Sequence, residues 1–112
     1  MRNTRSSTGQ TFCVSVVSEG REVVVAVRGE LDLASAEVLE FEVRKLRVAG
    51  FDRLVVDLRN VDFMDSAGLR LLISLRNAAK REGHRLSIVP GPSQVQRIFD
   101  LTATRGLFDW RA

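Results

Sequence analysis

The sequence predicts one small α/β domain, in which a mixed β-sheet of about four to five strands packs against about three to four flanking helices. Two observations predict this fold class. Apolar, β-branched runs alternate with amphipathic stretches of helical period, in the order β-β-α-β-α-β-α. The chain of 112 residues also has room for one hydrophobic core and not for two. Strands joined through helices favour parallel pairing with right-handed crossovers, so a sheet that also contains a hairpin is mixed.

The first two strands are predicted to form an antiparallel hairpin. Residues 12–16 alternate apolar and polar side chains, which is the pattern of a half-buried strand. A turn signal at 18–21 separates them from residues 23–27, a continuous run of apolar, mostly β-branched side chains. Because the connection is short, the two strands are neighbours in the sheet. The motif Gly-Glu-Leu-Asp at 29–32 is predicted to end the second strand.

An amphipathic helix is predicted next, and it ends at Gly50. Its start lies near Asp32 to Ser35, and either of these two side chains could cap it. The apolar residues that define the helix fall at helical spacing and are Leu39, Val43 and Leu46.

The next two elements repeat the alternation of strand and helix. Residues 53–58 have the pattern of a buried strand, and a helix is predicted at 66–81, stopped by Gly83. The residues expected to face inward from this helix are Leu69, Leu72, Ile73, Leu75 and Ala79.

The last third of the chain is predicted to hold one more strand and one more helix. The strand covers 85–89 and is stopped by the Pro-Gly-Pro that follows it. Ser93 is predicted to cap the last helix, which carries Val95, Ile98 and Phe99 on one stripe. Residues 106–108 are predicted to form a short closing segment.

Composition excludes several classes of protein. No apolar run approaches the roughly 18 residues that a membrane span needs, and no signal-peptide segment follows the N-terminus. The lone Cys13 rules out an internal disulfide, which fits a reducing compartment. We therefore expect a cytoplasmic protein without membrane contact. The polar residues 1–10 are expected to be a flexible tail that precedes a domain at 11–112.

The charge gives no support for nucleic-acid binding. Seventeen Lys and Arg residues oppose fourteen Asp and Glu residues, and the basic residues beyond the tail are scattered among acidic ones. A single tryptophan leaves little room for the aromatic platform on which single-stranded nucleic acid would stack. We expect no direct nucleic-acid partner.

No catalytic, cofactor or metal site is predicted. The chain has one histidine, His84, and one cysteine, with no acidic cluster at ligand spacing. His84 is expected to be a solvated loop residue. The segment 64–68, Met-Asp-Ser-Ala-Gly, resembles half of the nucleophile elbow of serine hydrolases. However, His84 is the only base available to Ser66 and stands at the far end of the helix that Ser66 begins, roughly 25 Å away. No glycine-rich phosphate loop is present, so we expect a protein that is not an enzyme.

Asp65 and Ser66 form the most informative pair in the sequence, because they stand between a buried strand and an apolar helix. A serine at a helix start satisfies an unpaired backbone N–H and stabilises the helix by about 1 kcal/mol. The same position also exposes a hydroxyl that another protein could modify. Local chemistry leaves both interpretations open and favours the cap.

The surrounding motifs change this balance, because together they resemble the STAS domain family, and more narrowly its free-standing anti-sigma factor antagonists. The resemblance covers residues from about 12 to 108. It is carried by Gly-Glu-Leu-Asp at 29–32, Val-Val-Asp-Leu at 55–58, Asp-Ser-Ala-Gly-Leu at 65–69 and Val-Gln-Arg-Ile-Phe at 95–99. It implies a small mixed sheet flanked by helices, in agreement with the pattern of elements.

The resemblance also implies a phosphorylation site and a set of partner-binding residues. Ser66 would be phosphorylated by a cognate anti-sigma factor with serine kinase activity, and a PP2C-type phosphatase is a further candidate partner. Ala67 takes a place where a second serine is common in the family, which removes an ambiguity about the site. The implied partner-binding residues are Asp32, Asp65, Ser66, Ala67 and Gly68.

These implications describe a binding switch. The unphosphorylated protein would bind the anti-sigma factor and release a sigma factor, and a phosphoryl group on Ser66 would prevent that binding by adding about −1.5 to −2 charges. Two alternatives remain open. One is a STAS-type docking subunit of a transporter complex, which does not require the Asp65-Ser66 pair. The other is a nucleotide-binding regulator, against which the missing phosphate loop counts.

Overall fold

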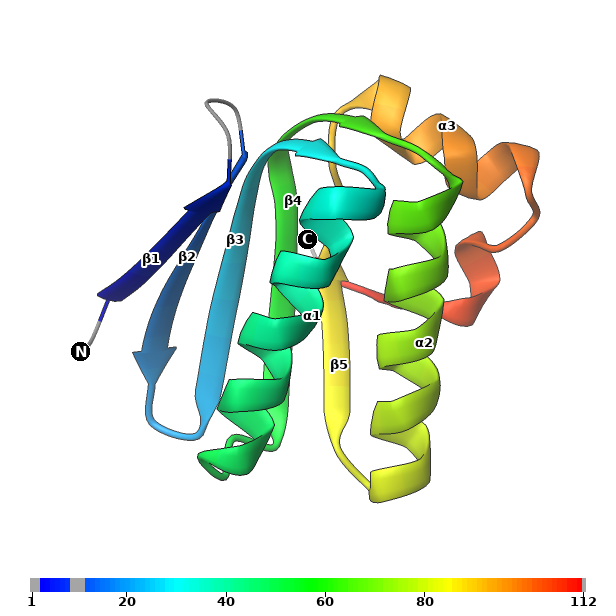
Figure 1. Cartoon of the computed structure of the whole chain (residues 1–112). Coiled ribbons are helices and arrows are strands. Elements are labelled where there is room, and N and C mark those ends of the chain that lie inside the picture. Colours follow the sequence, from blue (N-terminus) through cyan, green and yellow to red (C-terminus); the bar gives the residue numbers. More distant parts are fainter. Residues whose placement is uncertain (1–2, 9–11, 112) are drawn as a thin grey trace.

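The computed structural model describes residues 3–8 and 12–111, which form one sheet with helices packed against it (Figure 1). The strands are β1 (Asn3–Thr8), β2 (Phe12–Glu19), β3 (Glu22–Leu31), β4 (Arg53–Met64), β5 (Arg85–Val89) and β6 (Asp109–Trp110). The helices are α1 (Leu33–Val48), α2 (Ser66–Glu82) and α3 (Ser93–Leu101), with a 3₁₀ turn η1 (Arg105–Leu107) before the last strand.

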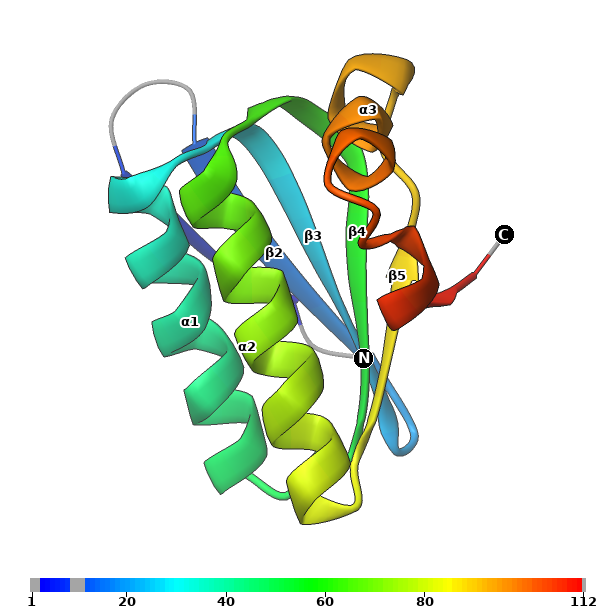
Figure 2. The ribbon, with the colours of Figure 1, turned by 90° about the vertical axis from the view of Figure 1, so that its right-hand side faces the viewer.

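The sheet is mixed, as the sequence predicts, and its spatial order follows the sequence from β1 to β6. The three strands β1, β2 and β3 pair antiparallel, and β3, β4, β5 and β6 pair parallel. Helices α1 and α2 lie side by side over one face, and α3 lies beyond the end of β4 at which α2 begins (Figures 1 and 2). This arrangement confirms the predicted fold class. The order β-β-α-β-α-β-α holds from β2 to α3, and short edge strands are added on both sides.

The first edge strand corrects the prediction of a flexible tail. Residues 1–10 were expected to be loose, but Asn3–Thr8 pairs antiparallel with β2 along its whole length. The paired segment is polar in sequence, so hydrophobic pattern alone gives no strand signal there. Main-chain hydrogen bonding to an otherwise open edge provides the reason for the strand. The rest of the predicted tail lies outside the described residues.

The two central strands are longer than predicted. The sequence placed the end of one strand at the Gly-Glu-Leu-Asp motif, yet β3 continues through Gly29 to Leu31. The backbone of Gly29 has a φ of 98°, and the register between β3 and β4 shifts just after it. Glycine therefore forms an irregularity within the ladder and does not end it. In the same way β4 runs past residue 58 to Met64, because β3 remains available as its parallel partner.

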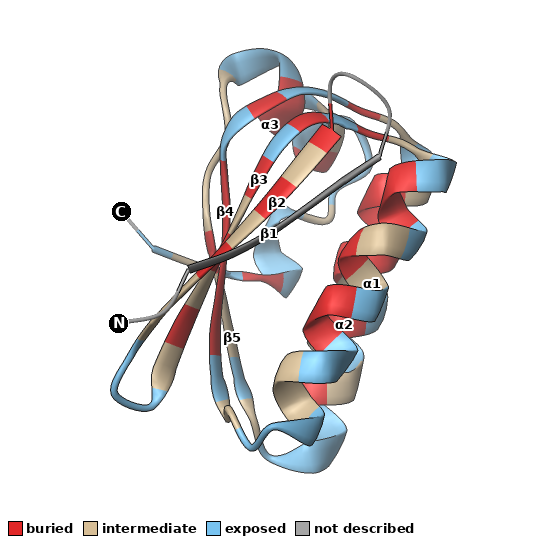
Figure 3. Ribbon diagram, turned by 60° about the vertical axis from the view of Figure 1, so that its left-hand side comes forward, coloured by how far each residue is buried: buried red, intermediate tan, exposed pale blue. Residues whose placement is uncertain are grey.

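The core lies between the sheet and the inner faces of α1 and α2, where buried residues recur on both layers (Figure 3). The largest fully buried side chains are Leu31, Leu39, Leu58, Leu72, Ile88 and Phe99. Most residues predicted to face inward do so, although Leu46, Ile73 and Ile98 are only partly buried. The alternation of apolar residues at helical and strand spacing therefore reports the core directly.

The carboxyl-terminal elements differ from the prediction in one cap. Ser93 was expected to cap α3, but Pro92 occupies the cap position and Ser93 is the first helical residue. Three aromatic rings then hold the chain end against the sheet. Phe99 contacts Phe108 edge-on at 5.4 Å between ring centroids and Trp110 edge-on at 5.0 Å. Among the described helices, none is long and apolar enough to cross a membrane.

Candidate functional site

The parallel pairing of β3 and β4 brings Asp32 and Asp65 to the same end of the sheet. The last residues of the two strands, Leu31 and Met64, are register partners, so the residues that follow them occupy the N-cap positions of α1 and α2 at the same level. The backbone N–H of Asp65 donates to the carbonyl of Leu31 at 3.2 Å. Both aspartates line one shallow depression together with Leu33, Ala34 and Glu37. The predicted closeness of Asp32 to the Asp65-Ser66 segment is therefore present.

Gly68 permits this close approach of the two strand ends. A Cβ atom on Gly68 would lie 2.7 Å from the carbonyl oxygen of Leu31 and 2.8 Å from Cγ of Met64. Contacts this short are repulsive, so a side chain at position 68 would push α2 away from β3. The residue is buried in the first turn of α2. Its role in the site is to let the helix start where it does.

Asp65, and not Ser66, caps α2. The Asp65 side chain accepts hydrogen bonds from the backbone N–H groups of Ala67, at 2.9 Å, and of Gly68, at 3.2 Å. Ser66 is the first residue of the helix and is exposed. Its hydroxyl takes part in no hydrogen bond within the described part of the chain. The cap interpretation of Ser66 was therefore wrong, since a neighbour already satisfies the N–H groups that a cap serves.

Asp32 and Ser35 cap α1 together, which resolves the two predicted candidates. The backbone N–H of Ser35 donates to the Asp32 carboxylate at 3.1 Å, and the backbone N–H of Asp32 donates to the Ser35 hydroxyl at 2.8 Å. The hydrogen bonds from the Ser35 backbone and side chain lower the pKa of Asp32. Asp32 is therefore ionised at neutral pH. Its side chain is also only half-buried. One carboxylate thus serves the helix and still faces the depression.

The site carries an acidic rim beside a helix N-terminus. Asp32, Asp65 and Glu37 contribute carboxylates to the same depression, and Leu33 adds an apolar side chain that is 69% exposed. The N-terminal end of α2 carries the positive end of the helix dipole, which tolerates an anion at Ser66. Chemically, the site offers an exposed hydroxyl near several carboxylates. Nowhere in residues 3–8 and 12–111 do three or more His, Cys, Asp or Glu side chains gather as metal ligands would.

A groove between α1 and α2 extends from this site. Ala67, Arg70 and Leu71 line it from α2, and Leu33 and Glu37 line it from α1. Two further wall residues, Glu40 and Ser74, also line a second hollow near the last turns of the helices. The predicted site residues omitted Leu33, Glu37 and Arg70. Arg70 follows Ser66 by four residues and Glu37 follows Leu33 by four residues, so helical spacing would have indicated that each pair shares a helix face.

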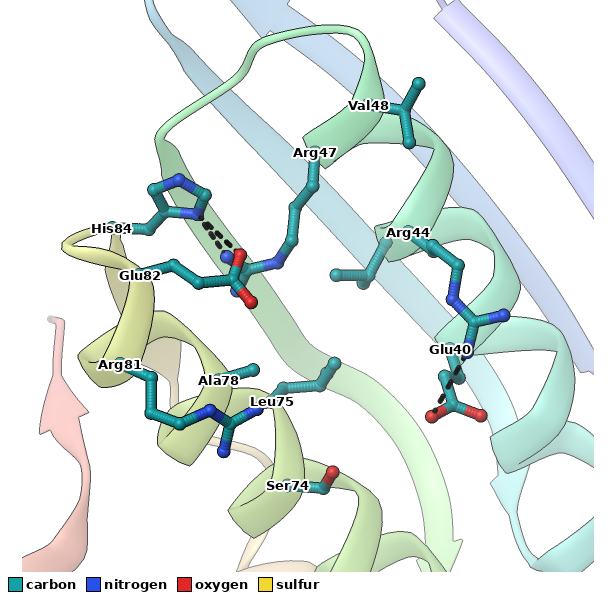
Figure 4. Close-up of a pocket in the computed structure, with 11 residues that line it drawn as sticks. Glu40, Arg44, Arg47, Val48, Ser74, Leu75, Ala78, Arg81, Glu82 and His84 are labelled. Atoms are coloured by element: carbon teal, nitrogen blue, oxygen red, sulfur yellow. Dashed lines mark hydrogen bonds and ion pairs between the residues drawn. The ribbon is translucent and has the colours of Figure 1, made fainter.

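His84 lines the second hollow, near the last turns of α1 and α2 (Figure 4). Arg47 donates a hydrogen bond to Nδ1 of His84, and the carboxylate of Glu82 lies 3.9 Å from the same nitrogen. His84 lies in the loop between α2 and β5, as expected, but its side chain is only 25% exposed. The 17 residues of α2 separate it from Ser66 by about 25 Å of helix rise. The two side chains do not form a nucleophile and base pair.

The fold and the site together define a class of protein. A family model described as "Mlab, STAS domain" matches residues 14–108. This range is most of the chain, and it includes the strand ends and the start of α2. The chain belongs to the STAS domain family.

Two similar proteins within these comparisons are anti-sigma factor antagonists. The anti-sigma-B factor antagonist of Bacillus subtilis (strain 168) is 30% identical over 96 residues, which cover 86% of this chain and 87% of the relative. The crystal structure of an anti-sigma factor antagonist from Mycobacterium paratuberculosis has 26% identity and a TM-score of 0.73, and the match covers 87% of this chain and 82% of that chain.

The structures of the anti-sigma factor antagonist SpoIIAA share the fold in two states. The unphosphorylated form matches with a TM-score of 0.74 and 18% identity, over 88% of this chain and 88% of that chain. The phosphorylated form, from Bacillus, matches with a TM-score of 0.68 and 17% identity, over 88% of this chain and 91% of that chain.

Proposed function

We propose that this protein is an anti-sigma factor antagonist that is switched by phosphorylation of Ser66. The unmodified form binds an anti-sigma factor with serine kinase activity and so releases a sigma factor. The observation that carries the proposal is the exposed Ser66 hydroxyl, which caps no helix and directly follows Asp65, whose side chain lines one depression with that of Asp32. The names of the relatives support the anti-sigma factor antagonist part of this proposal.

The physical chemistry of the site supports a switch that acts through binding. A phosphoryl group on Ser66 adds about −1.5 to −2 charges at the start of α2, where the helix dipole accommodates them within the monomer. A partner shaped for the neutral hydroxyl would meet added charge next to Asp32 and Asp65 and an unfavourable desolvation cost. Each 1.4 kcal/mol lost is a tenfold loss of affinity. The protein itself performs no chemistry, since the kinase supplies the nucleotide and the metal ion.

Phosphate incorporation is the first test. The purified protein is incubated with ATP and a candidate anti-sigma kinase, and the modified residue is located by mass spectrometry. Ser66→Ala is expected to abolish incorporation. Ser93→Ala is the matched control, because Ser93 is also an exposed first residue of a helix. Phosphate on Ser93, or on the buried Ser35, with Ser66 unmodified would contradict the proposal.

Partner affinity is the second test. Calorimetry compares the unmodified protein, the protein phosphorylated at Ser66, and Ser66→Asp, with circular dichroism melts of each form. Phosphorylation is expected to weaken binding at least about tenfold without unfolding the domain. Ser66→Asp should reproduce only part of this loss, because a carboxylate carries about one charge. Equal affinities for the three forms would remove the switch.

Asp32 is proposed to contribute its charge to partner docking. Asp32→Asn separates this role from capping, because asparagine caps a helix about as well as aspartate does. The variant is expected to melt like the wild-type protein and to bind the partner more weakly. Glu19→Gln serves as the control, because it removes one exposed carboxylate from the turn between β2 and β3 at the opposite end of the sheet. If Asp32→Asn leaves the affinity unchanged, Asp32 is a cap and nothing more.

A second candidate function is supported by the description of the matching family model, which names Mlab. In this alternative the domain is a docking subunit of a transporter complex and needs no phosphorylation. A pull-down with the unmodified protein separates the two functions by the partner that it recovers. A transporter subunit in the eluate, bound equally well by Ser66→Ala and Ser66→Asp, would favour the docking subunit.

A further inference from the structure

Arg70 stands one helical turn after Ser66 on α2. Its side chain is exposed, and within the described part of the chain it has no ion pair or hydrogen bond. It lines the groove between α1 and α2, where Glu37 and Glu40 stand on the opposite wall. Glu40 lies 3.7 Å from Arg44, and Glu37 has no ion pair among residues 3–8 and 12–111. The guanidinium of Arg70 is therefore the cation nearest in sequence to Ser66 on its helix and is not committed to another group.

The geometry of a helix places Arg70 within reach of a phosphate on Ser66. Residues four apart lie on the same face, with Cβ atoms about 5 to 6 Å apart. An acidic group four residues before a basic one is the favourable orientation, because it also agrees with the helix dipole. A guanidinium pairs with phosphate oxygens through charge-assisted hydrogen bonds, which are about twice as strong as neutral ones.

We propose that Arg70 is the counter-ion of phosphorylated Ser66, and that it moves from the groove to the phosphate when the serine is modified. This inference rests on the proposed function, because it assumes that Ser66 carries a phosphate in one state of the switch. The pair holds the phosphate against the first turn of α2. Arg70 is thus a positioning residue for the modified state.

The move of Arg70 also changes the groove. In the unmodified protein a cation stands across from Glu37 and Glu40. When Arg70 turns to the phosphate, that wall loses its positive charge and the two carboxylates face an uncharged surface. A partner that contacts both the Ser66 end and the groove then meets two electrostatic changes. One is the added phosphate, and the other is the loss of the Arg70 charge from the groove. The switch is extended by about one helical turn beyond the modified residue.

The test uses the full chain with phosphoserine installed at position 66 by chemical or genetic means. A ³¹P NMR titration measures the second pKa of the phosphate, which is ordinarily about 6. Arg70→Gln is expected to raise this pKa by about 0.5 pH unit, because the charged form loses its counter-ion. Arg81→Gln is the matched control, since it removes the same charge from the same helix about 22 Å away. Circular dichroism checks that all forms are folded.

Each outcome decides the inference. The pair is supported if the phosphate pKa rises in Arg70→Gln but not in Arg81→Gln. In Arg70→Lys, which keeps the positive charge, the pKa should stay close to that of the protein with Arg70. Equal shifts in Arg70→Gln and Arg81→Gln would mean a general effect of net charge and would overturn it, as would no shift in either. Because the phosphate is installed without a kinase or partner, failure of the phosphorylation or binding assays leaves this measurement intact. The two proposals therefore fail separately.

Discussion

At the scale of single residues, Asp65 and Ser66 are neighbours with separate tasks. Asp65→Ala should lower the free energy of unfolding by about 1 kcal/mol, because two backbone N–H groups of α2 lose their acceptor. Ser66→Ala should change it by less than about 0.5 kcal/mol, since the hydroxyl is exposed and does not cap. Urea denaturation of both variants measures the difference. A larger loss for Ser66→Ala than for Asp65→Ala would restore the serine cap.

Gly68 gives a second prediction at the residue scale. Gly68→Ala places a Cβ within 3 Å of the Leu31 carbonyl and of Met64, and should cost about 1 to 3 kcal/mol of stability. The control is Gly106→Ala, where an added Cβ meets nothing within 4 Å. Urea denaturation compares the two variants with the wild-type protein. A neutral Gly68→Ala would mean that the strand ends and α2 can separate without loss.

At the scale of the elements, α1 depends on Ser35. This side chain is 2% exposed, donates to the carbonyl of Glu30 at 2.7 Å and accepts from the backbone N–H of Asp32. Ser35→Ala leaves both groups without their partner, and should destabilise the domain by about 1 to 2 kcal/mol. Ser93→Ala is the control, because α3 has no side-chain cap. Thermal melts followed by circular dichroism distinguish the two.

The hydrogen bonds of Ser35 that stabilise α1 also affect the candidate site. The hydrogen bonds of Ser35 join the end of β3 to the first turn of α1, so they also hold Asp32 and Leu33 at the depression. If Ser35→Ala melts like the control, the turn is held by other contacts. In that case the position of Asp32 depends on the packing of α1 against the core.

At the scale of the whole molecule, several arginine–carboxylate pairs make stability depend on pH. Burial raises the pKa of Asp57, but hydrogen bonds from the Arg59 side chain and backbone outweigh it and hold the pKa below its usual value. The hydrogen bond from Arg111 likewise lowers the pKa of Glu22. A lowered folded-state pKa gives stability that is fully present above the unfolded value and is lost as the pH falls through the folded value.

The protein should therefore lose stability in acid. The loss should begin below about pH 4, where unfolded carboxylates take up protons, and should continue as the paired carboxylates titrate. Thermal melts between pH 7 and pH 2 measure it. Asp57→Asn should flatten part of this dependence, because the carboxylate on the central strand β4 is then absent. A melting temperature that is constant down to pH 2 would contradict the prediction.

The sequence by itself determined the type and order of the elements between β2 and α3. These features depend on side-chain periodicity, which is a local property of the chain. It also placed Ser66 at a helix start, because a β-branched strand, a short polar segment and an apolar helix follow one another there. The STAS resemblance added the expectation that Asp32 lies nearby.

Only the tertiary structure decided which residues at the ends of β3 and β4 cap the helices and which one stays exposed. The register of Leu31 with Met64 brings Asp32 beside Asp65, and that pairing joins residues far apart in the chain. The edge strands β1 and β6 likewise depend on a neighbouring strand that offers main-chain hydrogen bonds. A polar segment such as β1, or a two-residue segment such as β6, has no strand pattern of its own in the sequence. The choice of Asp65 over Ser66 as the cap also followed from backbone geometry at the end of β4. Hydrogen bonds made across the sheet and at helix ends, and not side-chain pattern, therefore decided what surrounds Ser66.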